Sequence, residues 1–454
     1  MTFTYQKGNS YKDSIGEKFV SHIWESGHFV KSNLRTKDGR IIEVLHPGQW
    51  NNDAGADFTD AVIGIDDKII KGDVEVHVQN SDWKIHHHDT DSRYNNTILH
   101  VVLWDGGTSL LARKQNNERI PNLILSDYLE GSISKLLKAE NNKSKHIQCP
   151  VNANPDIIDR AGIERLKIKS NAMNEQIASN GEDQALYEGI MDALGYSKNR
   201  KQFLDLAQKV PVNTLLGQKL EKIQAMLFGT ANLLPNIENR GKFDKETVEY
   251  LDIISPIWDE VKYQFHDKLM STDEWRFFRL RPDNFPTRRM AGISFILSNC
   301  ESEKSSLTAR FLSILKNNDR SIKELSRKLR TILTPKAYGY WTNHYTFGSK
   351  KYTQSDSLIG NSRADDIVIN VILPFTLAYS QRLSNEILSE CAMRLWTGYG
   401  RLQDNTVTRY FSNRIFQSEK EYHSIINSAS RQQGLIHIYK SFCSLHNCNN
   451  CPFM

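Results

Sequence analysis

The sequence predicts an α+β protein in which an N-terminal domain with a mixed sheet precedes a larger all-helical domain. Strand-like runs rich in Val and Ile lie before residue 130, and apolar residues recur with the helical period after residue 155. A polar, lysine-rich stretch at residues 138–145 lies between them. We therefore expect an α/β domain at residues 1–130, a linker at 131–154, a helical domain at 155–442 and a cysteine-rich terminal segment at 443–454.

An amphipathic helix is predicted to open the first domain at residues 14–29, with Phe19, Ile23 and Trp24 on one apolar face. Strands are expected at residues 41–45, 61–65, 69–78 and 97–104, because turn-forming Gly, Asn and Asp separate these runs. A short helix fits residues 89–95. The simplest architecture for these elements is an α/β sandwich built on a mixed sheet.

The second domain is predicted to be a succession of helices. The segments with helical periodicity are residues 156–179, 183–194, 199–208, 217–227, 245–269, 289–300, 305–316, 321–333, 364–383, 385–396, 405–416 and 432–442. Polar loops are expected at residues 236–244 and 345–361.

The composition is that of an ordinary soluble protein. Lys plus Arg (58) barely exceeds Asp plus Glu (53), so bulk charge neither demands nor excludes a polyanionic partner. No run approaches the ~20 apolar residues of a membrane span, and the polar residues 1–13 are unlike a signal peptide. We therefore expect a cytoplasmic protein with no membrane partner.

The most informative stretch is residues 72–78, Gly-Asp-Val-Glu-Val-His-Val. As a strand, it places Asp73, Glu75 and His77 on one face and the valines on the other. Burying charged groups without partners is costly, so this face is either solvated or part of a functional site. Asp57 upstream, and the acid- and histidine-rich residues downstream, favour a site.

This arrangement resembles the restriction-endonuclease-like superfamily, the PD-(D/E)XK nucleases. In that superfamily an Asp at the head of one strand and the first acid of the next strand's triplet bind a divalent cation, and the triplet's Lys orients water. Asp57 and Glu75 match the acids, and Glu17 matches an acid common on the opening helix. His77 stands where the superfamily has Lys, and Ala56 where it has Pro. The resemblance implies a nuclease core with Glu17, Asp57, Glu75 and His77 as catalytic residues.

Two carboxylates from neighbouring strands suit Mg²⁺ or Mn²⁺, which could activate water for attack on a phosphodiester. His77 could act as base or ligand, and an imidazole shifts the preference toward Mn²⁺, Zn²⁺ or Fe²⁺. His100, within a Val-rich strand, fits either a hydrogen-bonded core residue or a further ligand. The residues that could contact substrate near this strand are Asp73, His86, His88 and Asp91.

Three thiols crowd the C-terminus as Cys443, Cys448 and Cys451, a spacing that suits Zn²⁺ or an iron–sulfur cluster. Cys149 is the favoured fourth ligand and His446 the alternative. The set is similar in kind to the four-cysteine clusters that join a helical domain to the core in relatives of the RecB-like nucleases, where one cysteine precedes the acidic strand. That likeness implies a structural metal.

Residues 275–289 form the most basic and aromatic stretch of the helical part. Arg281, Arg288 and Arg289 could contact a phosphate backbone while the aromatic side chains stack on bases. The alternative is a buried corner in which these Arg side chains pair with acids.

Strings spread through the whole chain are also similar to those of an uncharacterised bacterial family, catalogued as domain of unknown function 2851. They lie at residues 45–48, 51, 55–58, 72–77, 81–83, 99–102, 194–196, 281–282, 284–286, 288–289, 370, 374–375 and 433–435. The likeness covers essentially the full length and implies no activity.

The function expected from the acidic strand is metal-dependent cleavage of phosphodiester bonds in DNA or RNA. One alternative is a non-catalytic nucleic-acid-binding or assembly protein with a degenerate site, as the missing Lys would allow. The other is a metal-dependent hydrolase of a small substrate, with His77, His86, His88 and His100 as ligands.

Overall fold

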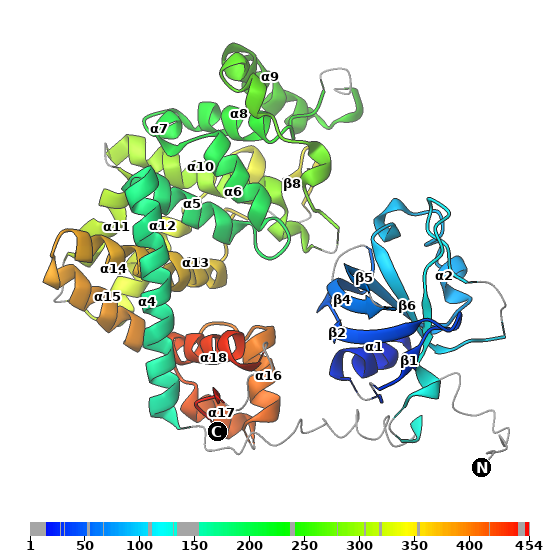
Figure 1. The fold of residues 1–454 in the computed structure, drawn as a ribbon. Helices are drawn as coiled ribbons and strands as arrows, with labels where there is room; N and C mark the ends of the chain where they lie inside the picture. Colours follow the sequence, from blue (N-terminus) through cyan, green and yellow to red (C-terminus); the bar gives the residue numbers. More distant parts are fainter. Residues whose placement is uncertain are drawn as a thin grey trace. The chain divides into compact units, whose positions relative to one another are not determined.

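The protein divides into two compact units, residues 1–145 and 146–454, in the computed structural model (Figure 1). The structure describes residues 15–27, 29–30, 32–51, 55–66, 68–107, 111–129, 131–133, 154–236, 241–278, 280–303, 306–316, 320–351, 355–416, 418–443 and 450–453. The first unit contains a mixed sheet and the second is almost entirely helical. The predicted α+β class is therefore confirmed.

The first unit is built on a sheet with the strand order β1-β2-β4-β5-β6-β7, and β3 pairs with β4. Pairs from β1 to β5 are antiparallel, whereas β5, β6 and β7 run parallel. Its elements are α1 (Glu17–Ser26), β1 (Leu34–Arg35), β2 (Ile41–His46), β3 (Gln49–Trp50), β4 (Phe58–Ile65), β5 (Lys68–Gln79), α2 (Asp82–Ile85), η2 (Ser92–Tyr94), β6 (Thr97–Trp104), β7 (Asn122–Ile124) and η3 (Leu125–Asp127).

Helix α1 covers the apolar face of the sheet. Its buried side chains, Phe19 and Ile23 among them, join a hydrophobic cluster with Val74 and Val76 of β5. The helix ends where Gly27 adopts a left-handed φ of 68° and its backbone N–H caps two carbonyls of the last turn. Because strand side chains alternate, the other face of β5 is left to Glu75 and His77.

The second unit is a succession of helices with one two-stranded hairpin. Its elements are α4 (Pro155–Asn180), α5 (Glu182–Leu194), α6 (Arg200–Lys209), α7 (Val212–Leu215), α8 (Leu220–Thr230), α9 (Lys245–Val261), α10 (Pro286–Glu303), α11 (Leu307–Leu315), α12 (Ile322–Leu333), β8 (His344–Thr346), β9 (Ser349–Lys350), α13 (Asn361–Ile367), the π-turn η10 (Val368–Ile372), α14 (Leu373–Arg382), α15 (Glu386–Gly398), α16 (Thr406–Arg414), α17 (Glu419–Ile425) and α18 (Ala429–Ser441). Short 3₁₀ turns lie at Lys262–Gln264, His266–Lys268, Thr272–Glu274, Pro282–Asn284 and Tyr340–Thr342.

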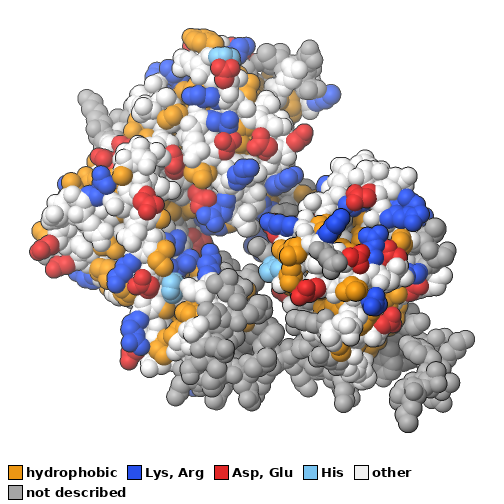
Figure 2. All heavy atoms as spheres, in the orientation of Figure 1, with side chains coloured by type: hydrophobic (Ala, Val, Ile, Leu, Met, Phe, Trp, Pro, Cys, Tyr) orange, Lys and Arg blue, Asp and Glu red, His pale blue; other side chains and the backbone are white. Residues whose placement is uncertain are grey.

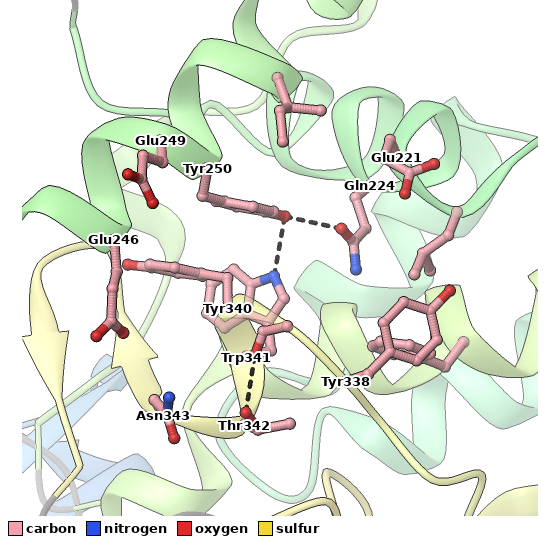
Figure 3. Close-up of a pocket in the computed structure, with 14 residues that line it drawn as sticks. Glu221, Gln224, Glu246, Glu249, Tyr250, Tyr338, Tyr340, Trp341, Thr342 and Asn343 are labelled. Atoms are coloured by element: carbon pink, nitrogen blue, oxygen red, sulfur yellow. Dashed lines mark hydrogen bonds between the residues drawn. The ribbon is translucent and has the colours of Figure 1, made fainter.

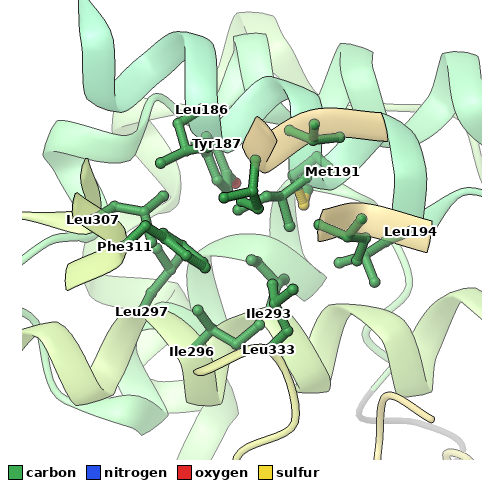
Figure 4. Close-up of a cluster of buried hydrophobic side chains, with 14 of the residues drawn as sticks. Leu186, Tyr187, Met191, Leu194, Ile293, Ile296, Leu297, Leu307, Phe311 and Leu333 are labelled. Carbon is green, nitrogen blue, oxygen red and sulfur yellow. The ribbon is translucent and has the colours of Figure 1, made fainter. Parts of the chain in front are cut away.

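The core of this unit is formed where α5, α10 and α11 pack together, with Leu333 of α12 (Figure 4). Leu186 and Met191 of α5 lie against Ile296 of α10 and Phe311 of α11, and all are fully buried. Apolar residues at helical spacing therefore face one another across the helix pairs, as the sequence periodicity predicts. No helix among the described residues combines the length and the apolar character needed to cross a bilayer.

Four predicted elements differ from the structure. The helix expected at residues 245–269 ends at Val261 and continues as 3₁₀ turns, and the helix at 89–95 is a 3₁₀ turn at Ser92–Tyr94. The helix at 364–383 is interrupted by η10, and the loop at 345–361 holds most of the β8–β9 hairpin. The short strands β1, β3 and β7 had no sequence prediction, because two or three residues are too few to show an alternation.

Candidate active site

The polar face of β5 is buried. Glu75 is 5% exposed and His77 is 1% exposed, so this face is not the solvated surface that a simpler interpretation of the alternation would give. Strand β6 runs parallel alongside and places His100 directly opposite Glu75. The imidazole of His100 is fully buried, and its Nε2 lies 2.9 Å from Nδ1 of His77. His100 therefore lies behind His77 and fixes the orientation of that ring.

Asp57 and Glu75 tie two strands together through reciprocal hydrogen bonds. The backbone N–H of Asp57 donates to Oε2 of Glu75 at 2.9 Å, and the backbone N–H of Val76 donates to Oδ2 of Asp57 at 3.3 Å. A β-bulge follows in β4, where Asp60 adopts a left-handed φ of 59°. The two acids predicted to converge are thus held side by side at the start of β4 and the middle of β5.

Two imidazoles lie next to one oxygen of Glu75, and a third lies next to one of those two rings. Its Oε1 lies 3.1 Å from Nε2 of His88 and 3.4 Å from Nε2 of His77, which in turn lies 3.2 Å from Nδ1 of His86. The ring nitrogens that His77, His86 and His88 offer all lie within 4.8 Å of one another. Ligand atoms about 2.1 Å from a tetrahedral cation are about 3.4 Å apart. The separation of 3.2 Å between His77 and His86 is close to this value, so these rings could hold a cation.

The turn after α2 brings His86 and His88 into this set. His87 adopts a left-handed φ of 60°, the backbone N–H of His88 donates to the carbonyl of Trp83, and that of His87 donates to Lys84. This is the Schellman arrangement, which usually has Gly at the left-handed position. Trp83 is buried and its Nε1 donates to a backbone carbonyl at 2.9 Å, so it anchors the turn.

The site is closed on one side and open on the other. Tyr94 stacks on His88 at a centroid distance of 3.8 Å, and both side chains are buried. On the other side, Oε1 of Glu17 lies 3.6 Å from Nδ1 of His86 and 3.9 Å from Nε2 of His77. The side chains of Glu17 and His86 are 46% and 41% exposed, so a substrate can approach from their side.

Burial favours the neutral form of the two buried carboxyls and of the buried imidazoles. It raises the pKa of Asp57 to about 7, with Glu75 and Glu17 adding repulsion, and it raises the pKa of Glu75 to about 8. Burial also lowers the pKa of His77, as do the neighbouring imidazoles, and lowers that of His100 to about 3. No Lys or Arg of the described chain forms an ion pair with Asp57 or Glu75. Burial lowers the pKa of His88 as well, so the rings of His77, His88 and His100 are neutral, the state in which a ring nitrogen binds a cation.

The donor set fits a transition-metal cation. Mg²⁺ takes oxygen ligands almost exclusively, whereas imidazole nitrogens together with carboxylates are the ligands of Zn²⁺ and of Fe²⁺, and Mn²⁺ accepts both kinds. Here three imidazoles and the carboxylates of Glu17, Asp57 and Glu75 lie together. Of the two cations that the acidic strand predicts, Mn²⁺ therefore fits better than Mg²⁺.

The other two acids predicted to contact substrate have local roles. Asp73 lies at the start of the β5–β6 pairing, and its carboxylate accepts from the backbone N–H of Asp60 at 3.3 Å. Asp91 caps the 3₁₀ turn η2, and its carboxylate pairs with the guanidinium of Arg93. Neither belongs to the group of close donor atoms, in contrast to His86 and His88.

Two arginines of residues 275–289, Arg288 and Arg289, are structural. Arg288 is fully buried and donates to the backbone carbonyls of Trp341 and His344 at 2.7 and 2.8 Å. Arg289 is 3% exposed and donates to the carbonyl of Leu358 at 2.8 Å. Because these guanidinium groups cannot reach a strand of nucleic acid, the prediction that they bind phosphate is corrected in favour of the buried corner. Arg281 is exposed.

The predicted cysteine site is only partly covered by the structure. Cys149, Cys448 and His446 lie outside the described residues. Cys451 is buried in a small hydrophobic cluster at the end of the chain, and Cys443 packs against the same cluster. The proposal of a Zn²⁺ or iron–sulfur site at these cysteines therefore stays a prediction.

A cavity of about 430 Å³ lies in the helical unit, between α8, α9 and residues 338–343 (Figure 3). The side chains lining it are largely occupied with one another. The hydroxyl of Tyr250 donates to Oε1 of Gln224 at 2.8 Å and accepts from Nε1 of Trp341 at 2.9 Å (Figure 3). This cavity has aromatic walls and an acidic rim, but it contains no acid–imidazole pair that could carry out hydrolysis.

A second group of possible metal ligands lies beside this cavity, formed by Asp244, Glu246 and His344. Asp244 caps α9 by accepting from the backbone and hydroxyl of Thr247. Glu246 pairs with Lys350 at 2.6 Å. Both carboxylates already have partners, so this group is a weaker candidate than the cluster around Glu75.

Sequence reasoning treated His86 and His88 first as substrate contacts and gave no role to Tyr94. Their placement depends on the left-handed turn at His87, and a non-glycine residue gives no local signal for such a turn. The available signal was the combination of a short helix anchored by Trp83 and a run of three histidines after it.

One family model matches the chain over residues 17–404, and its description is "Protein of unknown function (DUF2851)". The match covers the sheet, the cluster around Glu75 and most of the helical unit. No curated protein and no solved structure matches the chain.

Proposed function

This chain belongs to that family of unknown function, and we propose that it is a metal-dependent nuclease with its active site around Glu75. One observation carries the proposal. Oε1 of Glu75 lies 3.1 Å from Nε2 of His88 and 3.4 Å from Nε2 of His77, and all three side chains are buried. A buried carboxylate with two neutral imidazoles at ligand spacing is a typical metal-binding arrangement of hydrolases.

Glu75, His77 and His88 would hold the cation, and Asp57 would add a carboxylate from the neighbouring strand. When bound, the cation would polarise a phosphoryl oxygen and lower the pKa of a bound water. His100 would keep Nε2 of His77 directed at the site through the contact at Nδ1. These five residues therefore bind and orient, and none of them needs to move during the reaction.

His86 and Glu17 would handle the proton of the attacking water. Their donor and acceptor atoms lie 3.6 Å apart on the open side of the site, where substrate and solvent arrive. An imidazole next to a carboxylate can take up a proton near neutral pH and hold it until the products leave. His86 would in this way take over part of the task of the Lys that the restriction-endonuclease-like pattern has at the position of His77.

The choice of a phosphodiester substrate rests on the position of the acids in the sheet. Asp57 immediately before β4, Glu75 within β5 and Glu17 on α1 follow the pattern of the restriction-endonuclease-like nucleases, and their side chains lie close to one another. This agreement of chain order and contact supports a restriction-endonuclease-like core.

The test is cleavage of labelled DNA and RNA by the purified full-length protein. Bound cations are first removed with EDTA, and Mn²⁺, Zn²⁺ or Mg²⁺ is then added back separately. We expect cleavage with Mn²⁺ or Zn²⁺ and a loss of at least about 100-fold in Glu75→Gln, because the amide cannot supply the negative charge. Binding of the same cations is measured by calorimetry in parallel.

Glu43→Gln is the matched control, because Glu43 is exposed on β2 and lies outside the donor set. It should cleave like the native protein. The proposal fails if no cation restores cleavage of either nucleic acid, or if Glu75→Gln binds and cleaves like the control.

A further inference from the structure

A cluster of basic side chains lies in the helical unit and does not include Arg281, Arg288 or Arg289. Arg165 and Lys169 lie one turn apart on α4, Arg200 begins α6, and Lys440 lies near the end of α18. The charges of the other three all act on the ammonium group of Lys169. Lys and Arg side chains gather in the region of α4, α6 and α13 on the face that Figure 2 shows.

Two cations of this cluster, Arg165 and Lys169, are partly buried, and neither has an acidic partner at ion-pair distance among the described residues. Lys169 donates to the carbonyl of Asn370 at 3.4 Å, and Arg165 donates through Nε to Oε1 of Gln433 at 2.5 Å. Neither forms an ion pair with a carboxylate of the described chain. Like charges one helical turn apart repel each other, and burial adds the cost of lost hydration. An arrangement of this kind is stabilised when an anion occupies it.

The carboxylates near the cluster are already in use. Asp192 of α5 is held by the guanidinium of Arg200, and Glu164 of α4 lies 3.8 Å from Lys167 on the exposed side of the helix. Burial and the charge of Arg165 lower the pKa of His437 on α18, so its neutral imidazole neither adds to nor offsets the positive charge of the cluster. The cluster therefore has an excess of positive charge.

The packing of α18 on α4 sets the direction of the Arg165 fork. A Cβ at Gly434 would lie 2.2 Å from the carbonyl of Ile158, and one at Gly162 would lie 2.6 Å from that of Ser430, so only glycines allow this close approach. The approach brings the buried amide of Gln433 against Nε of Arg165. The two Nη nitrogens of Arg165 have no hydrogen-bond partner in the described part of the chain. They therefore leave a planar pair of donors for a ligand.

We propose that Arg165, Lys169, Arg200 and Lys440 form a binding site for a phosphate group. The guanidinium of Arg165 would bind two phosphate oxygens, and the partly buried ammonium of Lys169 would add a positive charge. The exposed side chains of Arg200 and Lys440 would contact the same phosphate or the next one. This deepens the proposed function, because the phosphate of a nucleic-acid strand is the ligand it implies. A free phosphate compound would present the same chemistry.

The experiment measures binding without cleavage, so that this inference and the nuclease proposal can fail separately. Full-length protein in EDTA is titrated into a fluorescein-labelled oligodeoxynucleotide, and anisotropy is recorded at several salt concentrations. Arg165→Gln combined with Lys169→Gln should weaken binding by about tenfold or more and should reduce the slope of log K against log salt by about 2.

The matched control removes the same two charges elsewhere on α4. Arg160→Gln combined with Lys167→Gln changes exposed positions of that helix and should leave affinity within about twofold of the native value, apart from a small general charge effect. Circular dichroism and thermal unfolding establish that both double variants are folded. The Arg165–Lys169 variant should be at least as stable as the native protein, because the removed charges repel each other.

A second titration distinguishes the source of the phosphate. If pyrophosphate binds with one-to-one stoichiometry and displaces the oligonucleotide, the site takes a free phosphate compound; if only the oligonucleotide binds, the site takes the backbone of a strand. Both results support a phosphate site. The inference is overturned if the native protein binds neither compound, or if the Arg165–Lys169 variant binds as tightly as the control.

Discussion

The two units bury ionisable groups of opposite kinds, acidic in one and basic in the other, without an oppositely charged partner among the described residues. In the N-terminal unit, the carboxyls of Asp57 and Glu75 lie among neutral imidazoles, and burial raises the pKa of each. In the helical unit, Arg165 and Lys169 lie together with no paired carboxylate in the described chain, and burial followed by neighbouring charges lowers the pKa of Lys169 to about 8. Each unit would be stabilised by a ligand of the opposite charge.

Burial alone does not identify such a site. Arg288 and Arg289 are more deeply buried than Arg165, but their guanidinium groups donate to backbone carbonyls that the fold itself supplies. Asp57 and Glu75 likewise form backbone hydrogen bonds, but an oxygen of Glu75 is left facing imidazole nitrogens at ligand spacing. A ligand site is therefore indicated by the donor or acceptor atoms that are not hydrogen-bonded to the protein backbone.

The largest effect should come from removing one of the buried imidazoles. His88→Ala should lower the affinity for Mn²⁺ or Zn²⁺ by at least about 100-fold, because Nε2 of His88 lies 3.1 Å from the Glu75 oxygen. Calorimetry on EDTA-treated protein measures the change. His266→Ala, at an exposed histidine of the helical unit, is the control and should bind the cation normally. If the two variants bind the cation with equal affinity, His88 is not a metal ligand.

The stability of the metal-free protein should fall as the pH rises from about 6.5 to about 8.5. The pKa values of Asp57 and Glu75 are raised in the folded protein to about 7 and about 8, so the folded state keeps protons that the unfolded chain has released. The lowered pKa values of His77 and His100 act in the opposite direction, but their effect is complete above about pH 6.5.

The expected loss of unfolding free energy over this range is about 2 kcal/mol. Urea unfolding of EDTA-treated protein at several pH values measures it, and Glu75→Gln should flatten most of the slope. Saturating Mn²⁺ should also remove the slope, because the cation competes with protons for the same oxygens. If the free energy of unfolding of the native protein instead rises through this pH range, the pKa values of Asp57 and Glu75 are not raised in the folded protein.

In the basic cluster, the free energy of unfolding should change with pH in the opposite direction. The pKa of Lys169 is lowered, so its protonated form is less stable in the folded protein than in the unfolded chain at neutral pH. Lys169→Met should therefore raise the free energy of unfolding by about 1 kcal/mol at pH 7, and this gain should shrink as the pH rises through about 8 toward 10.5. Lys167→Met on the exposed side of α4 should show neither effect. A destabilised Lys169→Met variant would contradict an excess of positive charge at this position.

The smallest effect is expected at the turn after α2. His87 has a left-handed φ of 60°, a conformation that Gly adopts without the steric cost of a Cβ. His87→Gly should therefore leave cation binding unchanged and should raise the free energy of unfolding by about 0.5 kcal/mol, as measured by urea unfolding with and without Mn²⁺. A weaker cation affinity would mean that the His87 ring itself takes part in the site.

Much of the fold could be predicted because its signals are local. The alternation at residues 72–78 identified β5 and its polar face, and the spacing of apolar residues identified most helices of the second unit. Helix starts were predicted to within three residues, in part because capping side chains such as those of Asn154 and Ser321 immediately precede the first turn. Asp57 and Glu75 lie together because Asp57 immediately precedes β4, the antiparallel neighbour of the strand that carries Glu75.

Features that depend on distant contacts could not be predicted in the same way. The sequence could not decide whether Arg288 is buried or exposed, and it did not single out Arg165, because the surroundings of each are set by residues far along the chain. Gln433, which orients Arg165, is 268 residues away from it. Likewise, the burial of the face carrying Glu75 depends on how the segment after β5 folds back, and not on the strand itself.

The parallel connection between β5 and β6 gives the candidate site a consequence for unfolding rate. Glu75 and His77 lie before this connection, His86 and His88 lie within it, and His100 lies in the strand after it. A cation held by residues of the strand and of the connection would act as a cross-link across a loop that otherwise carries only a short helix and a 3₁₀ turn. Bound metal would therefore slow the opening of the sheet at its parallel edge and give this unit a longer lifetime against proteolysis than its equilibrium stability alone would provide.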